Sequence, residues 1–200
     1  MEEIKRKFVI DTSLFTNPLS RKGFGNTTIE AVKNFLKIAQ KITNVQFYMP
    51  LSIKKELTHF LEGEQNPLLE SVICVKSPNL YEQQIPAPVV YKFIDEIRYR
   101  IDKGLKVSEK ALRDSEVELE QRIHNLREKY RKSLRDGVVD SKEDFDVVML
   151  AREIDAIIVT SDSGLMKMAE WLGISFIQAE RFFELLIYET GVDIPNKWVE

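Results

Sequence analysis

The sequence predicts an α/β fold in which a central parallel sheet, covered by helices, is interrupted by an inserted antiparallel helix pair. Short apolar runs of strand length alternate with longer segments of helical periodicity along most of the chain. Strands separated by helices pair in parallel, because a crossover helix returns the chain to the same end of the sheet. Between residues 88 and 136 this alternation stops. We therefore expect a single domain of residues 1–190 with a helical insertion at about 88–136, and a C-terminal tail of residues 191–200.

Three strands and two helices are expected before the insertion. Phe8 to Ile10 is a short apolar run typical of a buried strand, and a loop rich in glycine and proline follows it. Thr27 or Thr28 is placed to cap a helix that runs to about Lys41, and Pro50 opens the next helix. The expected strands cover residues 8–10, 45–49 and 72–75.

The insertion is predicted to be a pair of long helices that project from the domain. Apolar residues recur every four positions in its first half, and lysines and arginines lie roughly opposite them on the helix. The turn is expected at about Arg113 to Glu116, so the two helices run antiparallel. The apolar positions are Val89, Phe93, Ile97, Ile101 and Leu105 in the first helix, and Leu119, Ile123, Leu126, Tyr130 and Leu134 in the second.

Alternation of helices and strands resumes after the insertion. The periodicity predicts helices over residues 140–154, 163–171 and 179–188, and strands over residues 156–160 and 174–177. These strands would extend the same parallel sheet.

Composition places the chain among globular proteins. Apolar residues make up 44% and charged residues 30% of the sequence, and no apolar run is long enough to cross a bilayer or to act as a signal segment. We therefore expect a cytoplasmic protein with no membrane partner. The one cysteine, Cys74, excludes an intrachain disulfide and is expected to be a small core residue of the third strand.

Charge is segregated along the chain. The net charge is −3, which by itself argues against a nucleic-acid partner. Residues 92–135 carry thirteen Lys and Arg against nine Asp and Glu, a net charge of +4, which leaves −7 for the remainder. This asymmetry makes the helix pair the candidate surface for an acidic partner.

Aspartates are concentrated at one end of the predicted sheet. Asp11 follows the first strand, and Asp162 follows the strand of residues 156–160. Functional groups collect at the carboxyl ends of parallel strands, where the adjoining loops diverge. Three further aspartates, Asp140, Asp144 and Asp146, lie in the first turns of the helix after the insertion. Four or five carboxylates are thus expected around one crevice.

Carboxylates gathered in this way imply a bound cation, because they repel one another and raise one another's pKa values. Oxygen ligands without a histidine or cysteine partner suit Mg²⁺, with Mn²⁺ as a substitute, rather than zinc. A carboxylate-held Mg²⁺ that also takes water and a phosphate oxygen is the usual arrangement for phosphodiester cleavage.

Several of these acids also have a purely structural interpretation. Asp140 is a good N-cap, and Asp11 and Asp162 can cap turns. Asp144 is harder to explain this way, because it lies on the helix face that must meet the core and needs a partner there. Asp146 is interpreted either as an outer ligand or as a solvated residue.

Other titratable residues are expected on the surface. Glu56 can reach the crevice, but a place on the surface of its helix is favoured. His59 and His124 are isolated in the sequence and are expected to be solvated.

Particular segments resemble a known nuclease family. Residues 8–13, FVIDTS, and residues 157–162, IIVTSD, resemble the two ends of a PIN-domain nuclease. Three further segments resemble the HARP family, whose members are also called RNA ligase partner proteins. They are residues 93–105, FIDEIRYRIDKGL, residues 126–131, LREKYR, and residues 140–147, DSKEDFDV. The resemblance extends from about Phe8 to Leu186 and predicts a PIN-like three-layer fold.

The resemblance implies ribonuclease P activity, which is Mg²⁺-dependent endonucleolytic hydrolysis of precursor tRNA at the 5′ end of the mature tRNA. It implies a large homo-oligomer, built from dimers, that assembles through the projecting helices. It also implies that Thr12, Ser13 and Ser161 are supporting groups. The catalytic residues that it implies are Asp11, Asp140, Asp144, Asp146 and Asp162.

The residues themselves suggest how such a site would work. Metal ions held by Asp11, Asp144 and Asp162 would bind the scissile phosphate and lower the pKa of a bound water, which Asp140 or Asp146 would orient. The basic face of the helix pair would grip the tRNA backbone by shape, unless its cations are simply solvated. The candidate RNA-binding residues are Lys103, Lys106, Lys110, Arg127, Arg131, Lys132 and Arg135.

Three alternatives remain open. The protein could be a PIN-type endoribonuclease that acts on another RNA, although the long basic insertion disfavours a toxin-like nuclease. It could be a noncatalytic RNA-binding partner of an RNA ligase, against which the intact acid set argues. It could also be a structural assembly protein whose acids are capping residues, in which case it would not bind Mn²⁺.

Overall fold

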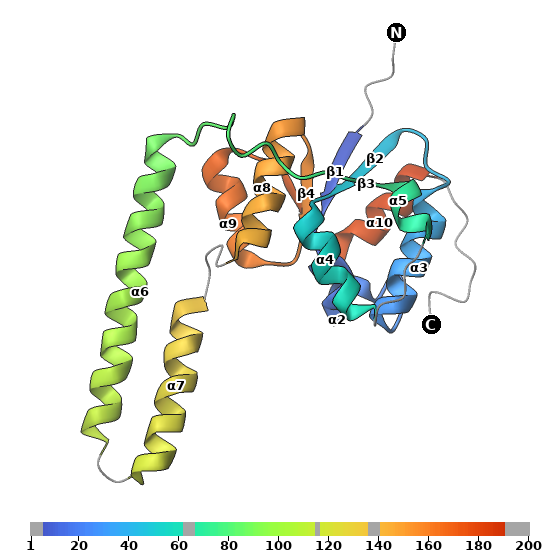
Figure 1. Cartoon of the computed structure of the whole chain (residues 1–200). Coiled ribbons are helices and arrows are strands. Elements are labelled where there is room, and N and C mark those ends of the chain that lie inside the picture. Colours follow the sequence, from blue (N-terminus) through green and yellow to red (C-terminus); the bar gives the residue numbers. More distant parts are fainter. Residues whose placement is uncertain (1–5, 62–66, 115–116, 136–140, 191–200) are drawn as a thin grey trace. The chain divides into compact units, whose positions relative to one another are not determined.

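In a computed structural model of the chain, two compact units are distinguished: residues 1–83 with 141–200, and residues 84–140 (Figure 1). The structure describes residues 6–61, 67–114, 117–135 and 141–190, the side chains of residues 134–135 and 189–190 excepted. No helix in these ranges is both long and apolar enough to span a membrane.

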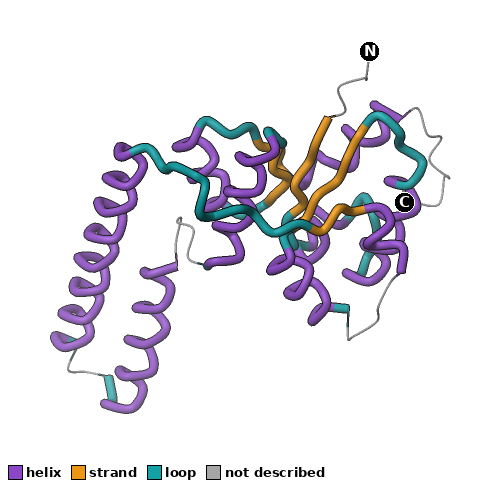
Figure 2. The backbone as a smooth tube through the Cα atoms, turned by 45° about the horizontal axis from the view of Figure 1, so that its top comes forward, coloured by secondary structure: helices purple, strands orange, loops and turns teal. Residues whose placement is uncertain are grey.

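The first unit is built on a parallel sheet, which confirms the predicted α/β class. Five strands are present in the described part of the chain, in the order β3-β2-β1-β4-β5, and every neighbouring pair is parallel (Figure 2). The strands are β1 (Arg6–Ile10), β2 (Val45–Met49), β3 (Ile73–Val75), β4 (Ile157–Thr160) and β5 (Phe176–Gln178).

Helices cover both faces of this sheet (Figures 1 and 2). Side chains alternate between the two faces of a strand, so Phe8 and Val9 of β1 enter different halves of the core. The Phe8 ring lies 5.2 Å from that of Phe182, and the Phe47 ring lies 5.2 Å from that of Phe35. The helices of this unit are α1 (Ser13–Thr16), α2 (Pro18–Arg21), α3 (Thr28–Ala39), α4 (Leu51–Phe60), α5 (Pro67–Val72), α8 (Lys142–Ile154), α9 (Ser163–Leu172) and α10 (Ala179–Thr190).

The loop after β1 and the position of Cys74 differ from the prediction, and helix α5 was not predicted. The expected loop after β1 contains α1 and α2, because Asn17 caps α2 by accepting a hydrogen bond from the Leu19 amide, with Pro18 at its first position. The expected core residue Cys74 is exposed instead. It lies on the three-residue edge strand β3, where Ile73 is the buried position and the next side chain points to the opposite face.

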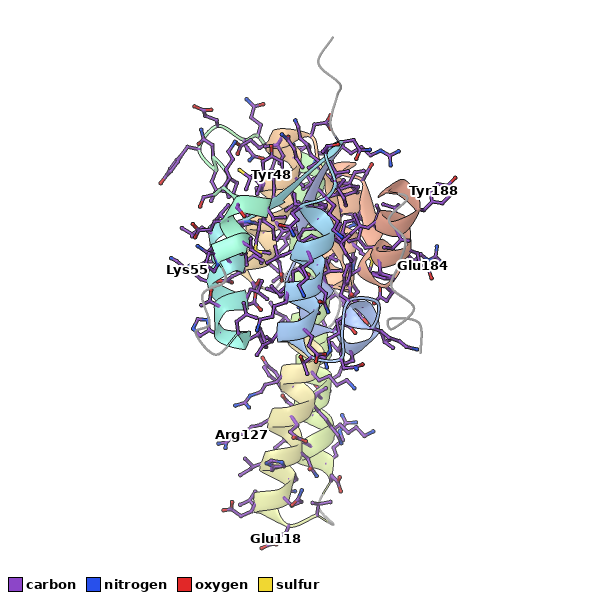
Figure 3. The ribbon with its side chains drawn as sticks, turned by 90° about the vertical axis from the view of Figure 1, so that its right-hand side faces the viewer. Tyr48, Lys55, Glu118, Arg127, Glu184 and Tyr188 are labelled. Carbon is purple, nitrogen blue, oxygen red and sulfur yellow. The ribbon has the colours of Figure 1, made fainter. Side chains whose placement is uncertain are left out.

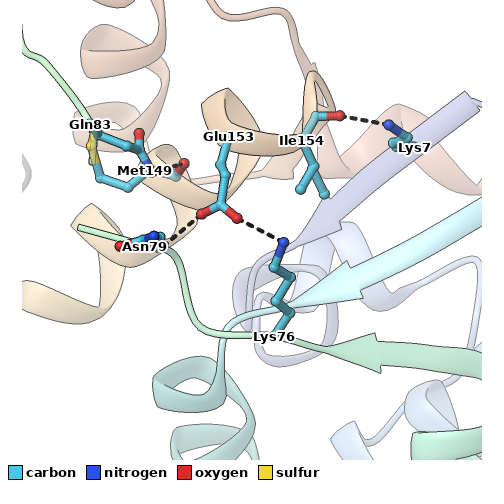
Figure 4. A network of polar contacts seen from close by, with 7 residues as sticks. All are labelled: Lys7, Lys76, Asn79, Gln83, Met149, Glu153 and Ile154. Carbon is cyan, nitrogen blue, oxygen red and sulfur yellow. Dashed lines mark hydrogen bonds and ion pairs between the residues drawn. The ribbon is translucent and has the colours of Figure 1, made fainter. Parts of the chain in front are cut away.

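A segment of residues 76–83, which we call the strap, runs from β3 along α8 (Figure 4). Glu153 of α8 lies 2.7 Å from the Lys76 ammonium and accepts a hydrogen bond of 2.6 Å from the Asn79 amide. The Gln83 side chain donates to the Met149 carbonyl at 2.9 Å. The strap is thus held along the C-terminal half of α8.

The second unit contains the two expected helices, α6 (Ala87–Arg113) and α7 (Leu119–Arg135), which run antiparallel and pack on each other (Figure 1). The predicted apolar positions of α6 are mostly exposed: Val89 is buried, but Ile101 is 60% and Leu105 57% exposed. A repeat of exactly four residues drifts around a helix of 3.6 residues per turn, so it leaves the packed face. That face contains Gly104, on which the Tyr130 ring of α7 lies closely.

Candidate active site

Asp11 lies at the carboxyl end of β1, where it is buried. Its Oδ2 accepts hydrogen bonds from the hydroxyls of Ser13 and Thr160, the second at 2.8 Å. Burial raises the pKa of Asp11, although these hydroxyls and the backbone amides of Thr12 and Ser13 lower it. The folded chain therefore holds a desolvated carboxylate, for which a cation would be the compensating partner.

Thr160, at the end of β4, connects Asp11 with the turn that carries Asp162. Its hydroxyl donates to Asp11 and accepts a hydrogen bond of 2.9 Å from the Asp162 amide. Asp162 also caps α9, since its Oδ1 accepts from the Leu165 amide at 2.8 Å. Its capping role is thus observed, and the Thr160 hydroxyl links its backbone amide to the Asp11 carboxylate across the neighbouring strands β1 and β4.

Two of the predicted supporting residues tie the same loops together. The Ser13 hydroxyl accepts a hydrogen bond of 2.8 Å from the Ser161 amide and lies 3.3 Å from the Thr160 hydroxyl. The Ser161 hydroxyl is hydrogen-bonded to Ser20 of α2. The loops after β1 and β4 are therefore joined by hydroxyl groups around Asp11.

Helix α4 contributes Glu56, which was expected on the helix surface. It lies instead beside the site, where its Oε2 is 3.4 Å from the Thr12 hydroxyl. The pKa of Glu56 is raised, first by burial and then by the negative charge of Asp11, with a smaller contribution from Glu143. The expectation was wrong because α4 begins directly after β2, which neighbours β1, so its first turns reach the same end of the sheet.

Helix α8 presents the remaining acids. It begins at Lys142 with Ser141 as its N-cap, whose hydroxyl accepts from the Asp144 amide at 3.0 Å. Asp144 is half-buried. The solvated interpretation of Asp146 is not supported, because Ser52 of α4 donates a hydrogen bond of 2.6 Å to its Oδ2. The N-cap interpretation of Asp140 was wrong, because Ser141 takes that role, and the predicted catalytic residue Asp140 itself lies outside the described residues.

The donor set fits Mg²⁺ or Mn²⁺ in kind. It consists of carboxylates, and those of Asp11 and Glu56 have raised pKa values because of burial and, for Glu56, mutual repulsion. In the part of the chain that the structure describes, no three His, Cys, Asp or Glu side chains form a group ready to hold an ion. His59 and His124 are exposed, as expected.

Residues near the site that the sequence prediction missed had detectable signals. Ser52 and Glu56 are four residues apart, so they share one face of the helix that follows a strand end. Thr160 was the last residue of a predicted strand and immediately precedes the expected supporting residue Ser161. A polar residue that ends a buried strand beside such an acid is a candidate hydrogen-bond donor to it.

Comparison with known proteins agrees with this geometry. Residues 7–189 match a family described as PINc domain ribonuclease, which is the class that the parallel sheet and its edge of acids define. An RNA-free ribonuclease P from Pyrococcus furiosus is 50% identical over 90% of this chain and 92% of its own length. The protein of the same name from Pyrococcus horikoshii is 49% identical over 90% of this chain and 91% of its length. The chain therefore belongs to the family of RNA-free ribonucleases P.

Proposed function

We propose that this protein is an endoribonuclease that removes the 5′ leader from precursor tRNA by metal-dependent hydrolysis in the cytoplasm. The relatives' name supports the substrate. The observation that carries the chemistry is the buried Asp11 carboxylate, linked through Thr160 to the Asp162 turn. Glu56 adds a further carboxylate beside them.

Asp11, Asp144 and Asp162 are the residues that we expect to hold the metal ion. Bound Mg²⁺, or Mn²⁺ in its place, would polarise the phosphodiester and lower the pKa of a water molecule. The chain's own contribution is orientation: Ser13 and Thr160 fix Asp11, and the cap of α9 fixes Asp162.

Hydrolysis breaks the bond between phosphorus and the leader's 3′ oxygen and leaves the phosphate on the mature tRNA. The attacking water must lose a proton, and we assign its orientation and deprotonation to Asp140 or Asp146. The hydrogen bond from Ser52 fixes the Asp146 carboxylate from α4. Glu56 is a further candidate for this role because its raised pKa makes it a better base than an ordinary carboxylate.

The helical insertion of the proposed 1–190 nuclease domain supplies cations for the RNA backbone. Lys106, Lys110, Arg127, Arg131 and Lys132 are exposed, and Lys103 is half-buried. Figure 3 shows Arg127 directed away from the helix pair. Side chains in this arrangement suit contacts to phosphates, which position an RNA without reading its bases. The side chain of Arg135 lies outside the described residues.

We also propose that the helix pair joins copies of the chain into a large homo-oligomer built from dimers. The support is the apolar surface of α6 that α7 leaves exposed, including Ile97, Ile101 and Leu105. Exposed apolar residues in a row are unfavourable in water and are covered when copies associate.

The test is to incubate the purified protein with 5′-end-labelled precursor tRNA and Mg²⁺ and to map the cut. We expect cleavage at the mature 5′ end, lost in Asp144→Asn and with EDTA, and retained in Glu180→Gln, which changes an exposed acid of α10. Cleavage elsewhere would indicate another RNA substrate. No cleavage together with intact RNA binding would favour a noncatalytic partner of a ligase.

A further inference from the structure

The helix pair contains a hollow of about 270 Å³ between α6 and α7, near the turn that joins them. Its apolar lining includes Val107 and Ala111 of α6 and Leu126 of α7. The volume is close to the ~300 Å³ lower end of small-molecule sites, so the hollow suits one small planar group rather than a large ligand.

The hollow arises from a change in side-chain size along the helix pair. At Gly104 the two helices approach closely, and a Cβ atom there would lie 2.8 Å from the Tyr130 ring. Toward the turn the facing residues are Val107 and Ala111, which are too small to fill the space between the helices.

Polar groups surround the opening, and hydrogen bonds hold two of them, Arg122 and Asn125. Arg122 donates a hydrogen bond of 2.9 Å to the Asp114 carbonyl, which holds its guanidinium at the rim. The Asn125 oxygen accepts from Gln121 at 3.0 Å, so its amide N–H groups are directed elsewhere. Lys110 and Lys129 are exposed at the rim, and neither forms an ion pair with any residue that the structure describes.

Charge selects the class of occupant. Three cations, Lys110, Arg122 and Lys129, line the hollow against the one carboxylate of Asp114. An apolar side chain from a second copy would pack against the walls but would desolvate Lys110 and Lys129 without giving either a partner. A nucleotide suits both the apolar walls and the cations at the rim, since its base is planar and largely apolar and its phosphate is anionic.

We propose that this hollow binds one unstacked nucleotide of the RNA substrate. The base enters between Val107, Ala111 and Leu126 and stacks on the guanidinium plane of Arg122, which is a common way of holding splayed-out RNA bases. The Asn125 amide donates to the base edge, while Lys110 and Lys129 contact the adjoining phosphates. The inference rests on the proposed function, because it names the part of that RNA which the helix pair holds.

The first experiment fills the hollow. Ala111→Leu and its matched control His124→Leu, which adds a leucine on the exposed side of α7, are compared in the Asp144→Asn chain with fluorescent precursor tRNA. We expect Kd to rise about tenfold for Ala111→Leu, as befits one lost stacked base, and to stay unchanged for His124→Leu. An unchanged Kd for Ala111→Leu, with helix content retained by circular dichroism, would overturn the inference. A changed oligomer mass with unchanged Kd would overturn it in favour of a second copy as the occupant.

The second experiment separates the hollow from the reaction. The protein without the Asp144→Asn substitution is photolabelled with 8-azidoadenosine monophosphate, and the labelled peptide is identified by mass spectrometry. Saturable labelling within residues 107–129, blocked by adenosine monophosphate and lost in Ala111→Leu, would support the nucleotide site even if precursor tRNA were not cleaved. Labelling that is unchanged in the Ala111→Leu chain would contradict the proposed nucleotide site.

Discussion

At the scale of single residues, the site depends on hydroxyl groups as much as on acids. Asp11 has a buried carboxylate, and the hydroxyls of Ser13, at the start of α1, and Thr160, at the end of β4, donate to one of its oxygens. Such donors keep a carboxylate in one orientation and lower its pKa against the effect of burial. Their loss should disturb catalysis more than it disturbs folding.

Thr160 provides the direct test of this view. Thr160→Val keeps the side-chain shape but removes one of the two hydroxyls that donate to Asp11 Oδ2 and leaves the Asp162 amide without its acceptor. We expect an unfolding free energy lower by about 1–3 kcal/mol and a kcat lower by at least tenfold, with KM little changed. Thr160→Ser, which keeps the hydroxyl, should restore most of the activity. Equal activity of the valine and serine variants would refute the role given to the hydroxyl.

Two helices end at residues in the left-handed region of backbone conformation. Asp155 ends α8 at φ 53°, whereas Gly173 ends α9 at φ 69°. A residue with a Cβ is disfavoured there by up to about 1–2 kcal/mol, less for Asp than for most. Asp155→Gly should therefore raise the unfolding free energy slightly, and Gly173→Ala should lower it by about 1 kcal/mol, as measured by urea denaturation. Changes of the same sign would contradict the argument.

At the scale of elements, the contact between Gly104 and Tyr130 sets the approach of α6 and α7. Gly104→Ala should gain about 1 kcal/mol of helix propensity, but its Cβ would meet the Tyr130 ring at 2.8 Å. We expect Gly104→Ala alone to be no more stable than the parent chain. The double variant Gly104→Ala with Tyr130→Ala should be more stable than Tyr130→Ala alone. Thermal unfolding of all four chains measures this coupling. Additive effects would show that the ring is not held against the helix.

The strap along α8 should respond to pH. Hydrogen bonds from Lys76 and the Asn79 amide lower the pKa of Glu153. The contribution of Glu153 to the stability of the folded strap is therefore present above the ordinary glutamate pKa of 4.5 and is lost as the pH falls through the folded pKa. The partner shift is opposite: the hydrogen bond to Glu153 raises the pKa of Lys76, whose contribution is lost only at alkaline pH. Limited proteolysis of the strap should therefore accelerate in acid. The Glu153→Gln chain should be cut faster at neutral pH and should lose most of this acid dependence. If proteolysis of that chain still accelerated in acid, Glu153 would be excluded as the cause of the pH response.

At the scale of the whole molecule, the sequence predicted the sheet well because buried parallel strands are short apolar runs bounded by helices. The acids at strand ends, Asp11 and Asp162, could be found for the same reason. Glu56 was assigned to the surface because an acid on an amphipathic helix has the same pattern whether it faces solvent or a site, and only its spacing of four from Ser52 indicated otherwise. The periodicity predicted the apolar positions of α6 correctly. It could not show that most of these side chains remain exposed in the single folded chain.

The division into two units predicts that cutting and selection of RNA are separable. A chain in which about ten Gly and Ser residues replace residues 84–140 should fold, because Ser141 and Met149 are eight helical residues, or about 12 Å, apart and Gln83 is held at Met149. We expect it to keep Mg²⁺-dependent cleavage of unstructured RNA and to lose at least tenfold of its preference for precursor tRNA. Competition assays with both RNAs measure this, with Asp144→Asn in the shortened chain as control. Retained preference would show that the first unit recognises tRNA by itself.

Helix α8 has a place in the chain that bears on communication between the units. The strap enters along its C-terminal half, and the chain returns from the second unit directly into its N-cap, Ser141. Both connections lead to the helix that bears Asp144 and Asp146, so we expect α8 to be the first element of the first unit to respond when RNA binds to the helix pair.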